Sequence, residues 1–207
     1  MQTLYVRSWK TLDHLLTKHL RRSRRMKQSR GYLRSGDRGT INIVNGASIR
    51  NRPKSIKPRR DIGPWKGGLV TGSGNTHIAT LVDRKSRFNL VLKLKGKDSK
   101  SVNGALIKAF KELPAGMKRS LTWDCGMELA QHFAFTQATG IPVYFSDHQS
   151  SWQRGAIENM NSLIRQYFPK KTSLAQHSPS VLDFAAKQLN PRSLKTFKFK
   201  YPKEIMV

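Results

Sequence analysis

The sequence predicts a mixed α/β domain preceded by a strongly basic arm. Three short runs with strand-like patterns follow one another between residues 65 and 94. After them, helical periodicity alternates with two further apolar runs up to residue 167. Strands joined by short turns pair antiparallel, whereas strands separated by a helix usually pair parallel. This order therefore predicts a mixed sheet with helices on both faces.

Five segments are predicted to form the strands of this sheet. Apolar or alternating residues dominate each of them, and turn residues such as Gly72, Gly74 and Gly140 separate them. The predicted strands are Trp65 to Thr71, His77 to Asp83, Phe88 to Leu94, Ser120 to Asp124 and Ile141 to Phe145. Two adjacent glycines, Gly67 and Gly68, weaken the first strand.

Three segments are predicted to be helices. The segment Ser99 to Leu113 places its apolar residues on one helical face, which is typical of a helix packed on a sheet. Gly140 is expected to end a helix over Met127 to Thr139, and Pro169 to stop a helix over Ser151 to Tyr167. Three strands followed by alternating helices and strands is the order found in ribonuclease-H-like domains.

The composition points to a polyanionic partner. The 207 residues include 39 Lys and Arg against 12 Asp and Glu, a formal charge of +27. Nucleic acid is the first candidate partner and an anionic membrane surface the second. The single cysteine, Cys125, excludes an internal disulfide and a multi-cysteine metal site. No apolar run suits a membrane span and Met1 to Lys10 lacks a signal-peptide core, so a soluble, cytoplasmic protein is expected.

The positive charge is concentrated in residues 1–60, which hold 17 Lys and Arg and two Asp. A leucine stripe at helical spacing, Leu12, Leu15, Leu16 and Leu20, is expected to dock on another surface, a partner chain being one option. The stripe leads into a run predicted to bind DNA phosphates, namely Arg21, Arg22, Arg24, Arg25 and Lys27. A solvated basic linker is the alternative.

Two carboxylates are placed where metal-assisted chemistry on DNA would need them. Asp124 ends the predicted fourth strand, and Glu158 lies on the predicted last helix. Hard oxygen ligands of this kind suit Mg²⁺ or Mn²⁺, and two-metal phosphoryl transfer needs a cage of them. Arg154, Asn161 and Arg165 share a helical face with Glu158 and are predicted to contact DNA. A helix-capping Asp124 and a solvated Glu158 are the alternatives.

Between residues 121 and 170 the chain carries a series of short motifs. They are Leu121-Thr122-Trp123-Asp124-x-Gly126, Gly140-Ile141-Pro142-Val143-Tyr144-Phe145, Trp152-Gln153-Arg154-Gly155, Glu158-Asn159-x-Asn161 and Arg165-Gln166-Tyr167-Phe168-Pro169-Lys170. Together they resemble the IS-thirty family of bacterial insertion-sequence transposases, which are DDE enzymes related to retroviral integrases. The 33 residues between Asp124 and Glu158 reproduce the family's interval between its second and third acids.

The resemblance implies that Asp124 and Glu158 are catalytic and bind metal, with Mg²⁺ or Mn²⁺ as the cofactor. It implies an integrase-like catalytic core over residues 61–170, after the basic arm and linker of residues 1–60. A helical or extended tail over residues 171–207 would complete that core. The implied partners are transposon ends and target DNA in a bacterial nucleoid, with a homo-oligomer left open and no membrane.

The first acid of the family is absent from this chain. The family motif reads Trp-Glu-Gly-Asp-Leu, whereas this chain reads Trp65-Lys66-Gly67-Gly68-Leu69. Gly68 therefore stands at the position of the bridging Asp, and Lys66 replaces another acid. Asp61 and Asp83 are poor substitutes, because one lies in a Pro- and Arg-rich connector and the other on the next strand. Catalysis is expected to be strongly impaired or absent.

Other departures from the family motifs lie nearby. Cys125, His148-Gln149 and Ser151 replace residues usual in the family, and Met1 corresponds to a point inside the family pattern. An N-terminal helix-turn-helix region is therefore expected to be missing. These features favour a transposase copy that is truncated and catalytically impaired.

A non-catalytic, sequence-tolerant DNA-binding protein is the alternative function. A ribosome-associated basic protein would share the charge but would not predict the spacing of Asp124 and Glu158. Structural roles are predicted for four other residues: Glu128 and Asp147 as surface acids, and Trp65 and Trp152 as aromatics of the core or the site wall.

Overall fold

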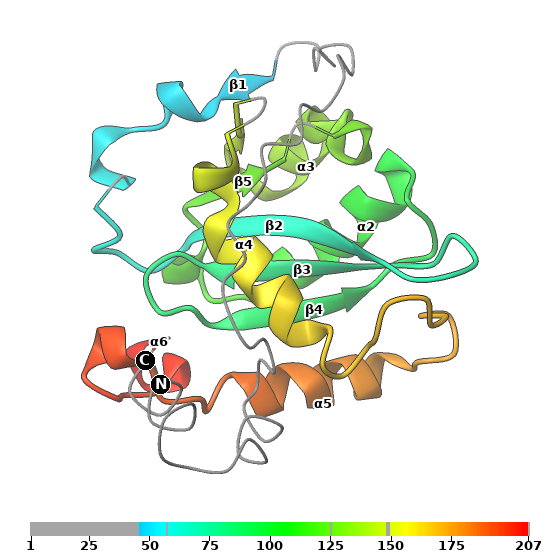
Figure 1. The fold of residues 1–207 in the computed structure, drawn as a ribbon. Coiled ribbons are helices and arrows are strands. Elements are labelled where there is room, and N and C mark those ends of the chain that lie inside the picture. Colours follow the sequence, from blue (N-terminus) through cyan, green and yellow to red (C-terminus); the bar gives the residue numbers. More distant parts are fainter. Residues whose placement is uncertain (1–45, 57, 125, 148–149, 207) are drawn as a thin grey trace. The chain divides into compact units, whose positions relative to one another are not determined.

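The structure, a computed structural model, describes residues 46–56, 58–124, 126–147 and 150–206, and Figure 1 shows their arrangement. The predicted leucine stripe and the basic run of residues 21–27 lie outside the described residues, as do Cys125 and His148-Gln149.

A six-stranded mixed sheet forms the centre of the described part. Its spatial order is β1 (Ala47–Ser48), β6 (Val143–Phe145), β5 (Ser120–Trp123), β2 (Pro64–Thr71), β3 (His77–Asp83) and β4 (Asn89–Lys93). Strands β2, β3 and β4 pair antiparallel, while β1, β6, β5 and β2 pair parallel. The five strands predicted from the sequence are confirmed to within two residues at each end. Strand β1 adds a parallel strand from the segment assigned to the linker.

Helices cover both faces of the sheet, as the order of segments predicted (Figure 1). Helices α2 (Ser99–Glu112) and α3 (His132–Thr139) pack on one face, and α4 (Ser151–Ile164) and α5 (Pro179–Leu189) on the other. Short turns and helices complete the chain: η2 (Ile49–Asn51), η3 (Lys54–Ile56), η4 (Ala115–Met117), η5 (Met127–Leu129), η6 (Lys195–Phe197) and α6 (Pro202–Met206). Within the described residues, no helix has the length and apolar character needed to cross a membrane.

The helix predicted over Met127 to Thr139 is divided in two. A 3₁₀ turn, η5, precedes α3, and the first residues of the two elements are five positions apart. The predicted end is confirmed, since Gly140 adopts a left-handed conformation with a φ of 71° and donates its N–H to Thr136. Left-handed residues of this kind are the usual helix terminators, and glycine adopts the conformation without strain.

Each face of the sheet has its own apolar core. On the α2 and α3 face, Trp65, Phe110 and Phe135 are fully buried and stack edge to face, with ring centroids 6.1 and 5.2 Å apart. The buried position predicted for Trp65 is confirmed, and its indole N–H donates to the Met117 carbonyl at 2.8 Å. On the other face, Ile157 and Leu182 bring α4 and α5 into a second core.

The two adjacent glycines of β2 face these two cores. A Cβ on Gly67 would lie 2.0 Å from a ring carbon of Trp123, which is closer than any side chain can approach. A Cβ on Gly68 would lie 3.1 Å from Cγ1 of Ile157 and 3.8 Å from the Asn161 amide nitrogen. Gly67 is therefore required by packing against β5. At position 68 a side chain needs only a small shift of Ile157 on α4.

This difference predicts that the same substitution destabilises the protein far more at position 67 than at position 68. Gly67→Ala should lower the free energy of unfolding by about 3 kcal/mol or more, because the Trp123 ring must move within a packed core. Gly68→Ala should change it by less than about 1 kcal/mol, because a small shift of Ile157 suffices and alanine restricts the unfolded chain. Urea denaturation of the two variants checks this, and equal destabilisation would contradict it.

Candidate functional site

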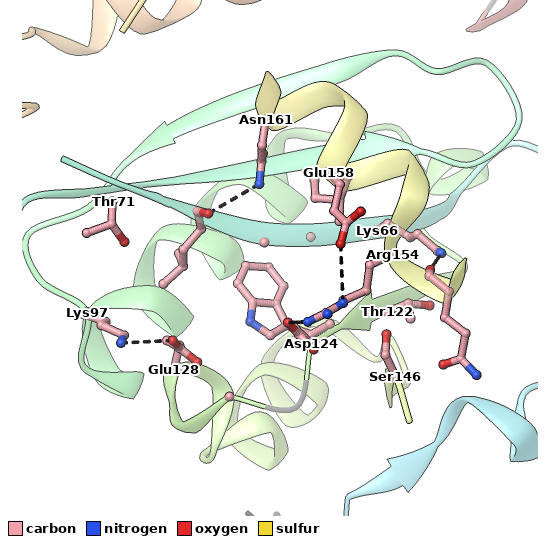
Figure 2. Close-up of a pocket in the computed structure, with 17 residues that line it drawn as sticks. Lys66, Thr71, Lys97, Thr122, Asp124, Glu128, Ser146, Arg154, Glu158 and Asn161 are labelled. Carbon is pink, nitrogen blue, oxygen red and sulfur yellow. Dashed lines mark hydrogen bonds and ion pairs between the residues drawn. The ribbon is translucent and has the colours of Figure 1, made fainter. Parts of the chain in front are cut away.

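A cavity of about 450 Å³ opens where β2, β5 and α4 meet, and Figure 2 shows the side chains that line it. Strands β2 and β5 run parallel with Lys66 opposite Thr122. This pairing brings the carboxyl end of β5, and hence Asp124, beside the middle of β2. Helix α4 crosses the same face and supplies Glu158, so Asp124, Glu158 and Gly68 all line one cavity.

Arg154 joins the two carboxylates across this cavity (Figure 2). Its Nη1 lies 2.6 Å from Asp124 Oδ2, and its Nε lies 3.8 Å from Glu158 Oε1. Arg154 and Glu158 are four residues apart on α4, the spacing at which helical side chains meet. All three side chains are between a third and a half exposed, so water screens these ion pairs and their net contribution to stability is small.

The side chains present do not fit a cage for two divalent ions. Such a cage needs several carboxylate oxygens around ions about 3.5–4 Å apart. Here Gly68 offers no side-chain oxygen, and the carbonyl of Gly68 accepts a hydrogen bond from Thr80 at 3.2 Å. Within the described residues, no three His, Cys, Asp or Glu side chains converge as a possible metal site. Two carboxylates bridged by one guanidinium form an ion-pair cluster, which differs chemically from a two-metal site.

Asn161 and Arg165 lie on the same face of α4 as Arg154, but they bond to the sheet. The Asn161 amide accepts from Thr80 at 2.6 Å and donates to the Leu69 carbonyl at 3.4 Å. Arg165 donates to the Thr71 carbonyl at 2.6 Å, and burial lowers the pKa of its guanidinium. These contacts fasten α4 across β2 and β3, so the predicted DNA contacts of Asn161 and Arg165 remain proposals.

The remaining acids near the site have structural partners. Asp83 is fully buried and accepts hydrogen bonds from the backbone of Gly63, Lys85 and Ser86, so it organises the turn after β3. The exposed Asp61 pairs with Arg119 at 2.7 Å. Both acids are therefore bound to structural partners, and the expectation that neither acts in the site remains a prediction.

Glu128 and Asp147 were predicted to be surface acids. Asp147 pairs with Arg50 at 2.9 Å, and hydrogen bonds from Gln153 and Arg50 lower the pKa of its carboxyl. Glu128 lines the cavity wall opposite α4 and lies 3.4 Å from Lys97, an ion pair that no sequence pattern indicated (Figure 2). The ion pair of Glu128 with Lys97, which lines this wall of the cavity, was therefore not predicted from the sequence.

Trp152 departs from the sequence prediction. Its side chain is 77% exposed, so the prediction of a core or site-wall position is wrong. Ile157, five residues further along α4, packs into the core, and a helix turns through about 140° over five residues. Trp152 therefore points away from the sheet.

Lys66 lies at the rim of the cavity and is almost completely buried. Its ammonium group donates to the Gln153 carbonyl in the first turn of α4. Burial, followed by the positive charges of four nearby arginines, lowers the pKa of Lys66 to about 8 from its ordinary value near 10.5. The four arginines are Arg84, Arg52, Arg59 and Arg87.

Comparisons with known proteins identify the relatives of this chain. No protein-family model matches the sequence. The chain is 58% identical over 205 residues to the transposase InsI for insertion sequence element IS30C of Escherichia coli K12, a span of 99% of this chain and 54% of that protein. The chain belongs to the IS30 transposase family.

A less similar relative is the transposase for insertion sequence element IS1086 of Cupriavidus metallidurans. It is 38% identical over 186 residues, which cover 89% of this chain and 53% of that protein. This IS30-family chain thus spans about half the length of the curated relatives that it matches.

The ribonuclease-H-like fold predicted from the order of segments is confirmed by a solved structure. One chain in the cryo-EM structure of the simian T-cell lymphotropic virus intasome in complex with PP2A regulatory subunit B56 gamma superposes with a TM-score of 0.57. The match covers 70% of this chain and 54% of that one at 17% sequence identity, so it shows the shared integrase-like fold.

The buried charge of Lys66 predicts a dependence of stability on pH. Below pH 8, Lys66 is protonated in both the folded and the unfolded protein, and burial of its charge destabilises the folded protein. Between about pH 8 and 10.5 the folded lysine loses its proton first, so the stability of the wild type should rise. Lys66→Met should therefore exceed the wild type in unfolding free energy at pH 7, by up to about 3 kcal/mol, and the gap should close by pH 10.5.

Urea denaturation at several pH values measures this gap. Lys108→Met is the matched control, because Lys108 is exposed on α2 and loses the same charge. Its gap to the wild type should stay within about 0.5 kcal/mol at every pH. A Lys66→Met gap that does not change with pH would show that the buried charge is not its cause.

Proposed function

We propose that this chain is the catalytic-core region of an insertion-sequence transposase whose DNA strand cleavage and strand transfer are impaired. The observation that carries the proposal is the composition of the cavity. Asp124 and Glu158 meet there from β5 and α4, and Gly68 faces the same space from β2 without a carboxylate. The proposed reaction, DNA strand cleavage and transfer, comes from the resemblance to the family. The weak activity is expected because position 68 carries glycine in place of an acid.

The impairment has a physical reason in the charges of the site. Divalent ions are held by carboxylates, and each carboxylate removed weakens both affinity and positioning. Here the two remaining carboxylates already interact with Arg154, so less negative charge is available to a cation. Lys66 adds a further positive charge two residues from Gly68. We therefore propose that Mg²⁺ or Mn²⁺ binds weakly at this site.

DNA is the proposed partner, at transposon ends and at target sites in the bacterial nucleoid. The net charge of +27 supports this proposal, because a polyanion relieves the repulsion among so many cations. Arg154 is one of the residues predicted to bind DNA, and it lines the cavity beside Asp124 and Glu158.

Restoring the carboxylate is the direct test of the impaired site. Gly68→Asp should fit with a small movement of Ile157, and it would place a third acid beside the other two. Mn²⁺-dependent cleavage of labelled duplex DNA carrying IS30 ends should rise by at least about 100-fold over the wild type, because the restored side chain is a direct metal ligand. Mn²⁺ affinity, measured by electron paramagnetic resonance, should increase in parallel.

Two controls separate the site from general effects. Glu158→Gln in the Gly68→Asp background should abolish the gained cleavage, since it removes one of the three carboxylates. Gly68→Asn has nearly the same volume as Gly68→Asp without the charge and should gain nothing. Detectable cleavage by the wild type at the rate of Gly68→Asp would overturn the proposed impairment.

The second candidate function is DNA binding without catalysis, and the imbalance of charge favours it. Phosphate contacts release counterions, so the logarithm of the binding constant should fall linearly with the logarithm of the salt concentration, by about 0.9 per contact. Fluorescence anisotropy with duplexes of unrelated sequence should give similar slopes, and EDTA should leave the affinity unchanged. An affinity that is insensitive to salt would contradict this candidate.

A further inference from the structure

A cluster of cations occupies the α4 face of the sheet, beside the pair of carboxylates. Arg52 follows η2, Lys66 lies on β2 and Arg84 follows β3, and each of the three is less than 10% exposed. We call these three residues the buried cation cluster. The positive charges of two further arginines, Arg59 and Arg87, also act on Lys66 and Arg84.

The backbone brings the three members together. Lys66 lies opposite Thr122 of β5 in the parallel ladder, and Arg52 donates from Nη1 to the hydroxyl of Thr122 at 3.4 Å. On the other side of β2, the backbone N–H of Arg84 donates to the Pro64 carbonyl at 2.9 Å, and the Arg84 guanidinium donates from Nη1 to the Ile56 carbonyl. Arg52 and Arg84 therefore lie against the strands on either side of Lys66.

The negative charge of Asp83 acts on Arg84, but burial and the positive charges of Arg52, Arg59 and Arg87 outweigh it. The carboxylate of Asp83, next to Arg84, accepts hydrogen bonds from three backbone N–H groups and from the Ser86 hydroxyl. Arg52 is 8% exposed, and its buried Nε has no hydrogen-bond partner among the described residues. A buried guanidinium with an unused donor is costly, and the cost rises when like charges lie beside it.

An anion would reverse this unfavourable balance. A phosphate group carries negative charge and several acceptor oxygens, which suit arginine forks and a lysine ammonium together. Access is available at Lys66, because Lys66 and Thr122 both line the cavity. The ammonium of Lys66 lies at the first turn of α4, where the helix dipole adds positive potential.

We propose that Arg52, Lys66 and Arg84 form a site for one backbone phosphate of DNA, reached from the cavity at Lys66. This inference rests on the proposed DNA binding and adds to it the position of one phosphate, at the Lys66 end of the cavity that Glu158 also lines. The bound phosphate neutralises charge that the fold otherwise buries, so it should stabilise the folded protein as well as hold the DNA.

Thermal unfolding of the full chain with inorganic phosphate tests the site itself. Sodium phosphate should raise the Tm of the wild type above its value in sodium chloride of equal ionic strength, by about 4 °C at ten times Kd. Lys66→Met should lose at least half of this shift, whereas the matched control Lys108→Met should keep it. Arg52→Met is the second variant of the cluster and should also lose it, while Arg52→Lys should keep most of it.

The salt dependence of DNA binding tests the source of the phosphate. Lys66→Met should reduce the slope of log K on log[salt] by about 0.9 relative to the wild type, while Lys108→Met should leave the slope unchanged. If Lys66→Met and Arg52→Met match Lys108→Met in both measurements, the cluster is not a phosphate site.

The remaining outcomes are distinct. One is that Lys66→Met loses the phosphate-induced rise in Tm while keeping the wild-type slope of log K on log[salt]. That result would mean that the site binds free phosphate, and it would overturn the assignment to DNA. Absence of DNA binding in every variant would overturn the proposed function, and the phosphate measurement would still decide whether the cluster binds anions. Circular dichroism establishes that each variant is folded.

Discussion

The parallel pairing of β2 with β5 is the constraint on which the site depends. It sets Lys66 opposite Thr122 and so places the end of β5 beside the middle of β2. The close approach of the two strands requires Gly67, because any side chain there would enter the Trp123 ring. In this register, Asp124 lines the cavity that Gly68 also lines, and α4 contributes Glu158 to it. The site is a consequence of strand register.

Electrostatics distinguishes this cavity from a metal-binding cage. Two carboxylates share one guanidinium at its centre, and buried cations lie on one flank. Gly68 offers no negative charge to the cavity, and Lys66 carries positive charge two residues away on the same face of the strand. Both features act in one direction, because each disfavours a divalent cation and favours a phosphate. In the function proposed above, the fold keeps its affinity for nucleic acid while its catalysis is weak.

Most of the secondary structure could be predicted from the sequence. The apolar runs that form β3 and β6 and the amphipathic pattern of α2 depend on neighbouring residues, and periodicity reports such local preferences well. The break between η5 and α3 could not be predicted, because its residues read as one continuous helical pattern. Trp152 was placed wrongly because its environment depends on the rotation of α4 against the sheet.

By itself, the sequence determined the order of the elements, the excess of positive charge and the absence of an acid at Gly68. Composition and motif spacing are properties of the chain alone. Only the tertiary structure decided that Arg154 joins the two carboxylates and that Asn161 fastens α4 to β3. It also placed the Arg52 guanidinium against Thr122, which lies on β5 opposite Lys66. Arg52 and Thr122 are 70 residues apart, and the register of the sheet brings them together, which no local pattern encodes.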